Sequence, residues 1–318
     1  MSLGSNALVA DASNEASATS AGSLKTPTTS WRRRERWLAL GAVAPAFLIV
    51  AGFMVYPVAF ALYISFTKTN GLTFEWRGLD NYTKLLTDPI VHQVFLVNLK
   101  FLISVPLVIF AALIVSVLLF ERIRGWKLYR VIFFLPNVLS VAVIGIMFRN
   151  AFGHYGTVNS FIVALGGEPI DFFTNGGYAI FVIIMALVWS GFGYQALLLL
   201  SGLTAIDPTV FEAAAIDGAG WWKRLWHITM PNIRAVLGFV FIINVLYTFS
   251  SLFGFIFVMT AGGPGYETTT IDYLVYLKAF EPRNIGEGAA LAVMLFVFIG
   301  ILTIIQNKAF KLGREDES

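Results

Sequence analysis

The chain has 318 residues, of which 57% are hydrophobic and only 13% are charged, with a formal net charge of +3. A soluble domain carries about 25% charged residues, so this composition excludes an ordinary soluble protein and indicates a polytopic membrane protein. The absence of cysteine excludes disulfides and thiolate metal sites. The three histidines, His92, His154 and His227, are far apart in expected loops, so we expect no metal site.

The N-terminal end combines a polar tail with a first apolar run. Residues 1–30 are rich in Ser, Ala, Thr and Gly, and we expect a disordered tail. The basic stretch 31–36 precedes an apolar run from Trp37 to Phe66. This run is too long for a signal peptide, whose apolar region spans about 7–15 residues, and a twin-arginine signal fails for the same reason. It is therefore predicted to be a membrane span.

Five further apolar segments follow, each with about the 20 residues that cross a hydrocarbon core. They are Asn98–Phe120, Val131–Phe152, Tyr178–Leu200, Ala235–Met259 and Gly288–Gln306. The predicted fold is all-α, with six transmembrane helices. Three connections, residues 67–97, 153–177 and 260–286, are expected on one side of the membrane. Fifteen of the 22 Lys and Arg residues fall on the other side, which the positive-inside rule places in the cytoplasm together with both termini.

The longest polar passage on the cytoplasmic side is predicted to fold as two short helices. Asp207 can cap a helix whose first position is Pro208, and Gly218 can end it. A basic and aromatic segment, Trp221 to Ile228, follows and is expected to end at Pro231. A different interpretation leaves this loop on the membrane surface, with its tryptophans in the headgroup layer.

This passage resembles a known motif. The sequence Glu212-Ala213-Ala214, followed at fixed spacing by Gly218, Ile228 and Pro231, is similar to the EAA loop of permease subunits of binding-protein-dependent ABC importers, with Met230 where leucine is usual. The resemblance covers about residues 37–312. It implies a type I importer fold, with a six-span domain at 31–312, a coupling loop at 203–233 and a short tail at 313–318. The residues that it implies for coupling to the ATPase are Glu212, Ala213, Ala214, Asp217, Gly218, Ile228 and Pro231.

Two outer segments strengthen the resemblance. Residues 78–82, GLDNY, are similar to the first external loop of sugar-type permeases, and residues 262–265, GGPG, match a family segment that precedes a surface helix ending at Ala279-Phe280. A phosphate-binding loop at GGPG is rejected, because the segment is expected outside and Pro264 lacks an N–H donor. A turn leading into an amphipathic helix is expected instead.

The chain shows no machinery for hydrolysing ATP. It lacks a G-x-x-x-x-G-K-[ST] loop, and no paired-carboxylate, metal or nucleophile constellation is apparent, so we predict no enzymatic activity and no catalytic residue. The resemblance implies that ATP and Mg are bound by two partner subunits. It also implies a second homologous permease, an extracytoplasmic substrate-binding protein, no nucleic acid and a bacterial or archaeal plasma membrane.

The transported solute is predicted from the interiors of the spans, which hold no Asp, Glu, Lys, Arg or His. Ion-coupled carriers usually keep an ionisable relay there, so the pattern disfavours them. Amides, hydroxyls and aromatic rings suit a neutral sugar, which we expect to be a di- or oligosaccharide, although the same residues can hold helices together. Glycerol 3-phosphate, an ion-coupled carrier or channel, and a membrane enzyme stay open as alternatives. From these residues and the resemblance to maltose-type permeases, the predicted path comprises Asn137, Ser140, Trp189, Ser190, Gly191, Tyr194, Tyr247, Thr248, Phe249, Ser251 and Leu252.

Overall fold

The structure is a computed structural model that describes residues 29–280 and 284–310. Of the predicted tails, the one at 313–318 and all but residues 29 and 30 of the one at 1–30 lie outside the described residues, and residues 29 and 30 belong to a helix. The chain divides into two compact units, residues 1–59 and 60–318. The described part of the first unit is helical, with α2 (Thr29–Val50), a π-helical turn η1 (Ala51–Val55) and the start of α3 (Tyr56–Ser65). It corresponds to most of the first predicted span.

Two π-helical turns each precede a proline. In η1 the Tyr56 N–H donates to the Ala51 carbonyl, one residue before Pro57. In η2 (Leu225–Thr229) the Met230 N–H donates to the Leu225 carbonyl, one residue before Pro231. Proline lacks an N–H and its ring clashes with the carbonyl four residues earlier, so a wider turn relieves the helix. The expectation that Pro231 ends the segment is wrong, because α13 continues to Asn232.

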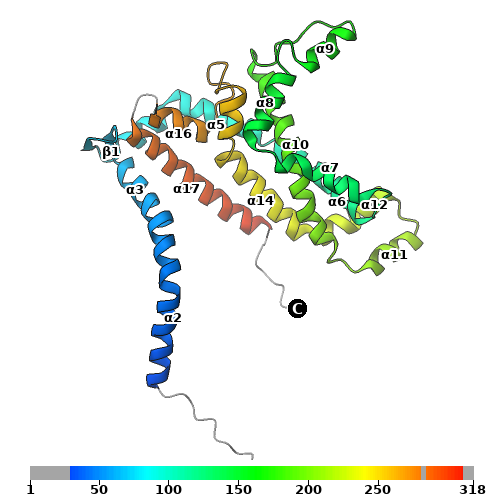
Figure 1. Cartoon of the computed structure of the whole chain (residues 1–318), viewed down its shortest axis with the longest axis horizontal. Coiled ribbons are helices and arrows are strands. Elements are labelled where there is room, and N and C mark those ends of the chain that lie inside the picture. Colours follow the sequence, from blue (N-terminus) through cyan, green and yellow to red (C-terminus); the bar gives the residue numbers. More distant parts are fainter. Residues whose placement is uncertain (1–28, 281–283, 311–318) are drawn as a thin grey trace, which may run out of the picture. The chain divides into compact units, whose positions relative to one another are not determined.

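The second unit contains a short hairpin and a helical bundle (Figure 1). The hairpin pairs β1 (Thr67–Thr69) with β2 (Phe74–Trp76) in antiparallel register, with Lys68 opposite Glu75. The helices after it are α4 (Asp80–Thr87), α5 (Pro89–Phe101), α6 (Ser104–Phe120), α7 (Trp126–Val138), α8 (Val141–Ala151), α9 (Thr157–Ala164), α10 (Gly176–Leu203), α11 (Pro208–Ile216), α12 (Trp221–Arg224), α13 (Met230–Asn232), α14 (Arg234–Ser250), α15 (Phe253–Met259), α16 (Ile271–Phe280) and α17 (Ile285–Phe310).

Four helical stretches of the described residues are long and apolar enough to cross a membrane: 41–65, 89–120, 176–203 and 285–310. Up to six spans result if each of two bent helix pairs counts as one. The second stretch begins at Pro89, so the prediction of a loop up to residue 97 is wrong, and His92 lies on a helix. Asp88 caps that helix by accepting a hydrogen bond from the Ile90 N–H at 2.9 Å.

The third predicted span is broken rather than straight. Helices α7 and α8 meet at an angle of 95°. Leu139 has an extended backbone, and the Ser140 hydroxyl begins the next helix by accepting from the Val143 N–H at 3.3 Å. The fifth predicted span is also interrupted, because α14 ends at Ser250 and α15 begins at Phe253. Just before this span, residues 221–232 meet α14 at an angle of 80°.

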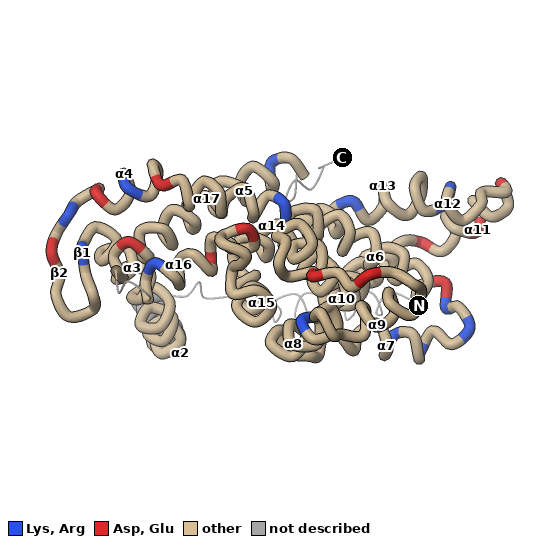
Figure 2. The backbone as a smooth tube through the Cα atoms, turned by 90° about the horizontal axis from the view of Figure 1, so that it is seen from above, with Lys and Arg blue, Asp and Glu red and all other residues tan. Residues whose placement is uncertain are grey.

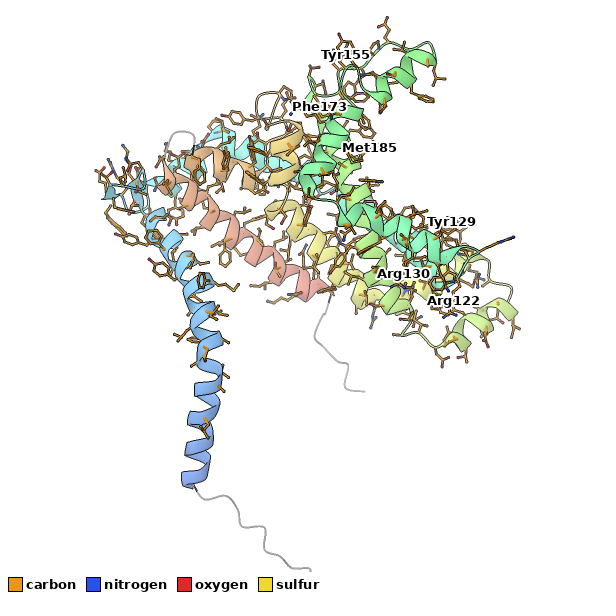
Figure 3. All side chains as sticks on the ribbon, in the orientation of Figure 1. Arg122, Tyr129, Arg130, Tyr155, Phe173 and Met185 are labelled. Carbon is orange, nitrogen blue, oxygen red and sulfur yellow. The ribbon has the colours of Figure 1, made fainter. Side chains whose placement is uncertain are left out.

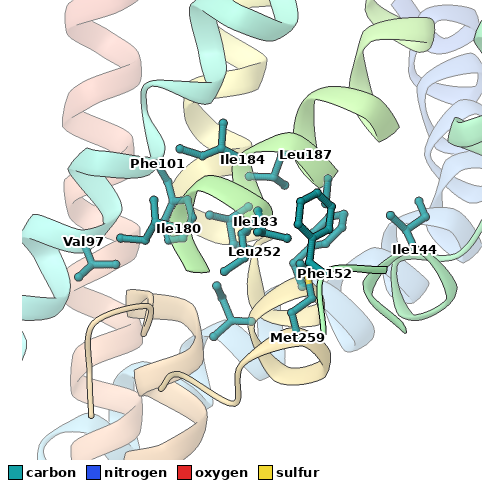
Figure 4. Close-up of a cluster of buried hydrophobic side chains, with 14 of the residues drawn as sticks. Val97, Phe101, Ile144, Phe152, Ile180, Ile183, Ile184, Leu187, Leu252 and Met259 are labelled. Carbon is teal, nitrogen blue, oxygen red and sulfur yellow. The ribbon is translucent and has the colours of Figure 1, made fainter. Parts of the chain in front are cut away.

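Helix α10 is central to the packing of the second unit. It lies along α6 and α7 (Figure 1), and its first half fills an apolar cluster that includes Ile180, Ile183 and Leu187 (Figure 4). Across the bundle, the buried Asn98 of α5 joins two other elements. Its Nδ2 donates to the Thr248 carbonyl at 2.8 Å, and its Oδ1 accepts from the Ile271 N–H at 2.8 Å.

The GLDNY segment has a structural role in this chain. Asn81 is buried, and its Nδ2 donates to the carbonyls of Ser65 and Thr67 at 2.8 and 2.9 Å. The Tyr82 hydroxyl lies 2.6 Å from the Ser65 hydroxyl. These bonds satisfy backbone carbonyls where α3 ends and the hairpin begins. The motif therefore fixes the exit of a span.

The GGPG segment forms a tight turn, as predicted. Gly262 and Gly265 have φ of +83° and +57°, the left-handed region that favours glycine. The Thr268 hydroxyl donates to the Gly263 carbonyl at 2.8 Å. The helix that follows is α16 (Ile271–Phe280), and because residues 281–283 lie outside the described residues, its predicted end at Phe280 stays a prediction.

A cluster of ion pairs ties α4, α16 and α17 together. Lys278 Nζ donates to Asp88 at 2.8 Å and to Glu287 at 2.7 Å. Lys84 Nζ donates to the second Glu287 oxygen at 2.7 Å. Burial favours a higher pKa for Asp88, but hydrogen bonds from Lys278 and the Ile90 N–H outweigh it and hold the pKa below 3.8. Burial also acts to lower the pKa of Lys278, yet its two carboxylate partners raise the pKa above 10.5.

These shifts predict how stability depends on pH. A depressed carboxyl pKa stabilises the fold above the unfolded pKa of about 3.9, and this contribution is lost as pH falls through the folded value. We expect Asp88→Asn, which keeps the helix cap, to lower the thermal midpoint at neutral pH and to flatten the decline below about pH 4. Thermal unfolding in detergent between pH 3 and 8 measures this, with exposed Asp80→Asn as the control. If, below about pH 4, the thermal midpoint of Asp88→Asn fell as steeply as that of the original protein, the stabilising role of the Asp88 ion pair would be contradicted.

Candidate functional site: a polar cavity and a coupling loop

A cavity of about 290 Å³ lies within the second unit, where α10 and α14 face the break between α7 and α8. Its polar lining is made of amides, hydroxyls and two tyrosines, and no charged side chain of the described residues contributes to it. The lining residues are Ser104, Val108, Pro136, Asn137, Leu139, Val141, Ile144, Leu187, Ser190, Gly191, Tyr194, Gln195, Ile243, Asn244, Tyr247, Thr248 and Phe255.

Several of the polar groups have hydrogen-bonding capacity left for a ligand. Gln195 Nε2 reaches Asn244 Oδ1 at 3.5 Å, while the buried Gln195 Oε1 has no protein partner. The Asn137 side chain is exposed, and Tyr194 and Tyr247 are 45% and 39% exposed. An unpaired buried acceptor costs free energy, so a hydroxyl donor in the cavity would be favoured.

The structure brings six of the predicted path residues together at this cavity: Asn137, Ser190, Gly191, Tyr194, Tyr247 and Thr248. The other five do not line it. Trp189 packs beside Phe148, with ring centroids 5.8 Å apart. Phe249 and Leu252 are buried in apolar clusters. Ser140 caps α8, and Ser251 is exposed between α14 and α15.

Sequence reasoning missed the contribution of α6. Ser104 and Val108 line the cavity, but in the sequence they belong to an apolar run without a polar face. The Ser104 hydroxyl donates to the Phe101 carbonyl at 2.7 Å, the pattern of an isolated serine within a membrane helix. Gln195 and Asn244 were visible as polar residues of the spans, but the resemblance did not select them.

The coupling loop folds as two helices joined by a glycine turn, as predicted. Asp207 accepts from the Thr209 N–H at 2.9 Å and so caps α11, which starts at Pro208. Hydrogen bonds with Thr209 also lower the pKa of the exposed Asp207 carboxyl below 3.8. At the other end, Gly218 has φ of +70°. The N–H groups of Gly218 and Ala219 donate to the carbonyls of Ala215 and Ala214 at 3.1 and 2.9 Å, which forms a Schellman motif.

The exposed face of α11 carries small side chains around one carboxylate. Glu212, Ala213, Asp217 and Gly218 are exposed, whereas Ala214 is buried. Across the described residues, no hydrogen bond or ion pair engages the Glu212 carboxylate. Farther along, Ile228 is half-buried and Pro231 is exposed. A carboxylate without an intramolecular partner, beside small alanines, can be approached closely by a basic group of another protein.

Within the second unit, charged residues gather in two regions, the turn before α7 and the stretch from β2 to α4 (Figure 2). Lys and Arg gather at the turn before α7, next to the coupling loop, while acidic and basic residues mix along β2 and α4 (Figure 2). Arg122 lies at that turn and Tyr129 and Arg130 lie at the start of α7, whereas Tyr155 and Phe173 lie far from them, toward α9 (Figure 3). The basic turn and the α9 region are thus separated by the helices that form the cavity.

Residues 85–311 match the family described as "binding-protein-dependent transport system inner membrane component". The chain belongs to this family. As predicted from the EAA loop, it is therefore a permease subunit of a binding-protein-dependent ABC importer. The match covers the cavity and the coupling loop, so both lie in the part that the family shares.

Curated relatives extend the likeness over most of the permease. This chain is 32% identical to the sn-glycerol-3-phosphate transport system permease protein UgpA of Salmonella typhi, over 86% of this chain and 94% of the relative. It is 31% identical to the lactose transport system permease protein LacF of Rhizobium radiobacter, over 83% of this chain and 91% of the relative. Both relatives are named as transport permease proteins, which agrees with the prediction of a transport subunit.

Solved structures show the fold. The permease superposes with a TM-score of 0.77 and 18% identity on a chain of a bacterial ABC transporter involved in the import of the acidic polysaccharide alginate, covering 91% of this chain and all of the other. A second alginate transporter structure, in complex with a pentasaccharide-bound periplasmic protein, gives a TM-score of 0.74 at 20% identity, over 87% of this chain and 96% of the other. The predicted type I importer fold is thereby confirmed.

Proposed function

We propose that this permease forms, with a second permease, the membrane path of a neutral carbohydrate that an external binding protein delivers. The carrying observation is the cavity: amide and hydroxyl groups from α7, α10 and α14 face it together with Tyr194 and Tyr247, without a charged side chain. Neutral donors and acceptors beside aromatic faces match sugar hydroxyls and the apolar faces of sugar rings. At about 290 Å³ the cavity is near the lower limit for ligand pockets, so a second permease would complete it.

The energy source is proposed to lie in partner subunits. Two ATP-binding subunits would bind ATP and Mg and dock on the exposed Glu212 surface of the coupling loop. ATP-driven closure would move the two coupling loops together and switch the bundle between inward and outward access. This arrangement requires both termini and the loop in the cytoplasm, which the bias of Lys and Arg favours. The coupling residues proposed are those from Glu212 to Pro231 predicted above.

Glycerol 3-phosphate is the second candidate, because the UgpA relative is named for its transport. A phosphate dianion favours Arg or Lys at its site. In the part of the chain that the structure describes, no such residue lines the cavity, and Arg149 lies in a separate open hollow, where its Nη1 donates to the Val258 carbonyl at 3.1 Å. The cavity therefore favours the neutral solute.

The deciding experiment measures binding of a panel of neutral mono-, di- and oligosaccharides and of glycerol 3-phosphate to the cognate external protein. Uptake of each binder by the complete importer in vesicles follows. We expect at least one neutral sugar to bind and to be transported in an ATP-dependent manner. Exclusive uptake of glycerol 3-phosphate, or uptake driven by an ion gradient without ATP, would overturn the proposal.

The cavity makes a residue-specific prediction. Asn137→Ala should lower sugar uptake roughly tenfold, because a polar contact to a ligand is removed, while the thermal midpoint stays the same. Stability is retained because the Asn137 side chain is exposed and holds no other element. Ser251→Ala, at another exposed polar position that does not line the cavity, should keep normal uptake. Equal uptake by both variants would exclude Asn137 from the path.

A further inference from the structure

Helix α6 connects the coupling loop with the cavity without being part of the loop's own chain segment. Helix α6 contributes Ser104 and Val108 to the cavity wall near its start. At its other end, the Phe120 ring lies 5.3 Å from the Phe211 ring of α11. The 17 residues of α6 span about 25 Å at 1.5 Å per residue. The same rigid element therefore touches the loop at one end and the solute cavity at the other.

An ion pair reinforces the contact at the loop end. Arg224 Nη2 lies 3.6 Å from Glu121 Oε1, directly after α6, and both side chains are about one-third exposed. The Arg224 Nε is buried without a hydrogen-bond partner. Both residues line a void of about 70 Å³ beside Phe120 and Phe211. Because Glu121 is the anion that Arg224 reaches, it holds the guanidinium in this apolar corner.

We propose that Glu121 and Arg224, together with the Phe120–Phe211 contact, form a joint through which the coupling loop moves α6 and thereby the cavity wall. This inference rests on the proposed coupling role of the loop. The Phe120–Phe211 contact resists separation of the loop from α6, and the ion pair fixes the orientation of the loop relative to the end of α6. The loop and α6 therefore shift as one body. Helix α10, packed along α6, carries the shift to Tyr194.

An ion pair with this exposure contributes little to folding stability. Its loss should therefore appear in coupling, the amount of solute moved per ATP hydrolysed, rather than in the amount of folded complex. A purely structural role would instead lower the yield or the thermal midpoint and leave that ratio unchanged. The two quantities separate a positioning role from a structural one.

The first experiment compares variants of the complete importer in lipid vesicles. Glu121→Gln and Arg224→Gln should each lower solute transported per ATP about fivefold. The charge-swapped double variant Glu121→Arg/Arg224→Glu should recover most of that loss. Arg124→Gln removes an exposed cation of the same turn and serves as the matched control. Normal coupling in both single variants, or a swap no better than the singles, overturns the joint.

The second experiment uses the absence of cysteine from the chain. In partners freed of cysteine, Phe120→Cys/Phe211→Cys can be joined by a short bifunctional thiol reagent. We expect low coupling before the reaction and recovery after it, because a covalent link replaces the aromatic contact. A cross-linked complex that hydrolyses ATP without transport would show that the loop must leave α6, and would overturn the proposal.

Glu212→Ala separates this inference from the proposed function. If Glu212→Ala removes transport while the Glu121 and Arg224 variants retain normal coupling, the loop docks as proposed but the joint is wrong. If Glu212→Ala, Glu121→Gln and Arg224→Gln all transport normally, the coupling role of the loop fails together with the joint. If all three variants lose coupled transport and the charge-swapped double variant recovers it, the coupling role of the loop and the joint are both supported.

Discussion

Valine in place of Gly193 is expected to destabilise the helical bundle strongly. A Cβ at this position of α10 would lie 2.1 Å from the Phe133 carbonyl oxygen of α7, so the two backbones would have to separate. Overpacking of this kind costs about 1–3 kcal/mol or more, and a displaced carbonyl has no flexible atom that could yield. Because Tyr194 and Pro136 adjoin this contact on the two helices, the cavity would be distorted as well.

The measurement is the thermal midpoint and the monodisperse fraction of the detergent-extracted permease complex. Gly191→Ala supplies the matched control, because a Cβ there meets Val108 at 3.6 Å, an ordinary contact distance. Both glycines lie on α10, two residues apart, and each substitution replaces glycine with a residue of higher helix propensity, so a loss of propensity cannot explain a lower stability. If Gly193→Val were as stable as Gly191→Ala, the close approach of α10 and α7 would be wrong.

The parts of the fold that were predictable from sequence are those with local causes. Asp207 and Pro208 start a helix and Gly218 ends it, and each acts through hydrogen bonds to its own neighbours. The long apolar spans were also predictable, because an uninterrupted apolar run can be recognised without knowing its neighbours in the fold. Asp88-Pro89 carried the same start signal, and overlooking it placed the beginning of a span nine residues too late, at Asn98.

The breaks in the third and fifth spans were not predictable from hydropathy. An apolar run from Val131 to Phe152 has the same mean hydropathy whether it is straight or bent by 95°. The turn depends on Leu139 taking an extended backbone and on the Ser140 hydroxyl capping α8. A single serine inside an apolar run does not by itself say whether it caps a new helix or continues the old one. The bend matters for the site, because Asn137 lies immediately before it and lines the cavity.

The composition of the cavity could be predicted only in part. Polar residues such as Asn137 and Tyr194 were visible because they interrupt apolar sequence. Helix α6 is apolar on every side, so its periodicity does not say which face meets the cavity. Phe249 and Leu252 came from the resemblance, and in this chain they fill apolar clusters instead. Such positions depend on long-range packing, which no local pattern encodes.

Replacing Glu212 by alanine should reduce transport by the complete importer roughly tenfold or more while leaving the permease folded. The proposed docking contact is a charge-assisted hydrogen bond, and losing one costs about 1.5–3 kcal/mol. Folding should be unaffected, because Glu212 is exposed on α11 and alanine favours the helix. Gly218→Val should have a similar effect for a different reason: φ of +70° is strained for a β-branched residue, so the turn after Ala215 would reshape.

Transport and ATP hydrolysis should be measured together on importers of verified subunit composition. Glu168→Ala removes another exposed carboxylate from the segment between α9 and α10, outside the coupling loop, and should transport normally. Because Glu212 acts by docking, its loss should also lower the fraction of ATP-binding subunits that copurify with the permease. Transport and copurification equal to those of Glu168→Ala would remove Glu212 from the docking surface, since an uncontacted carboxylate on α11 would then be only a solvated charge.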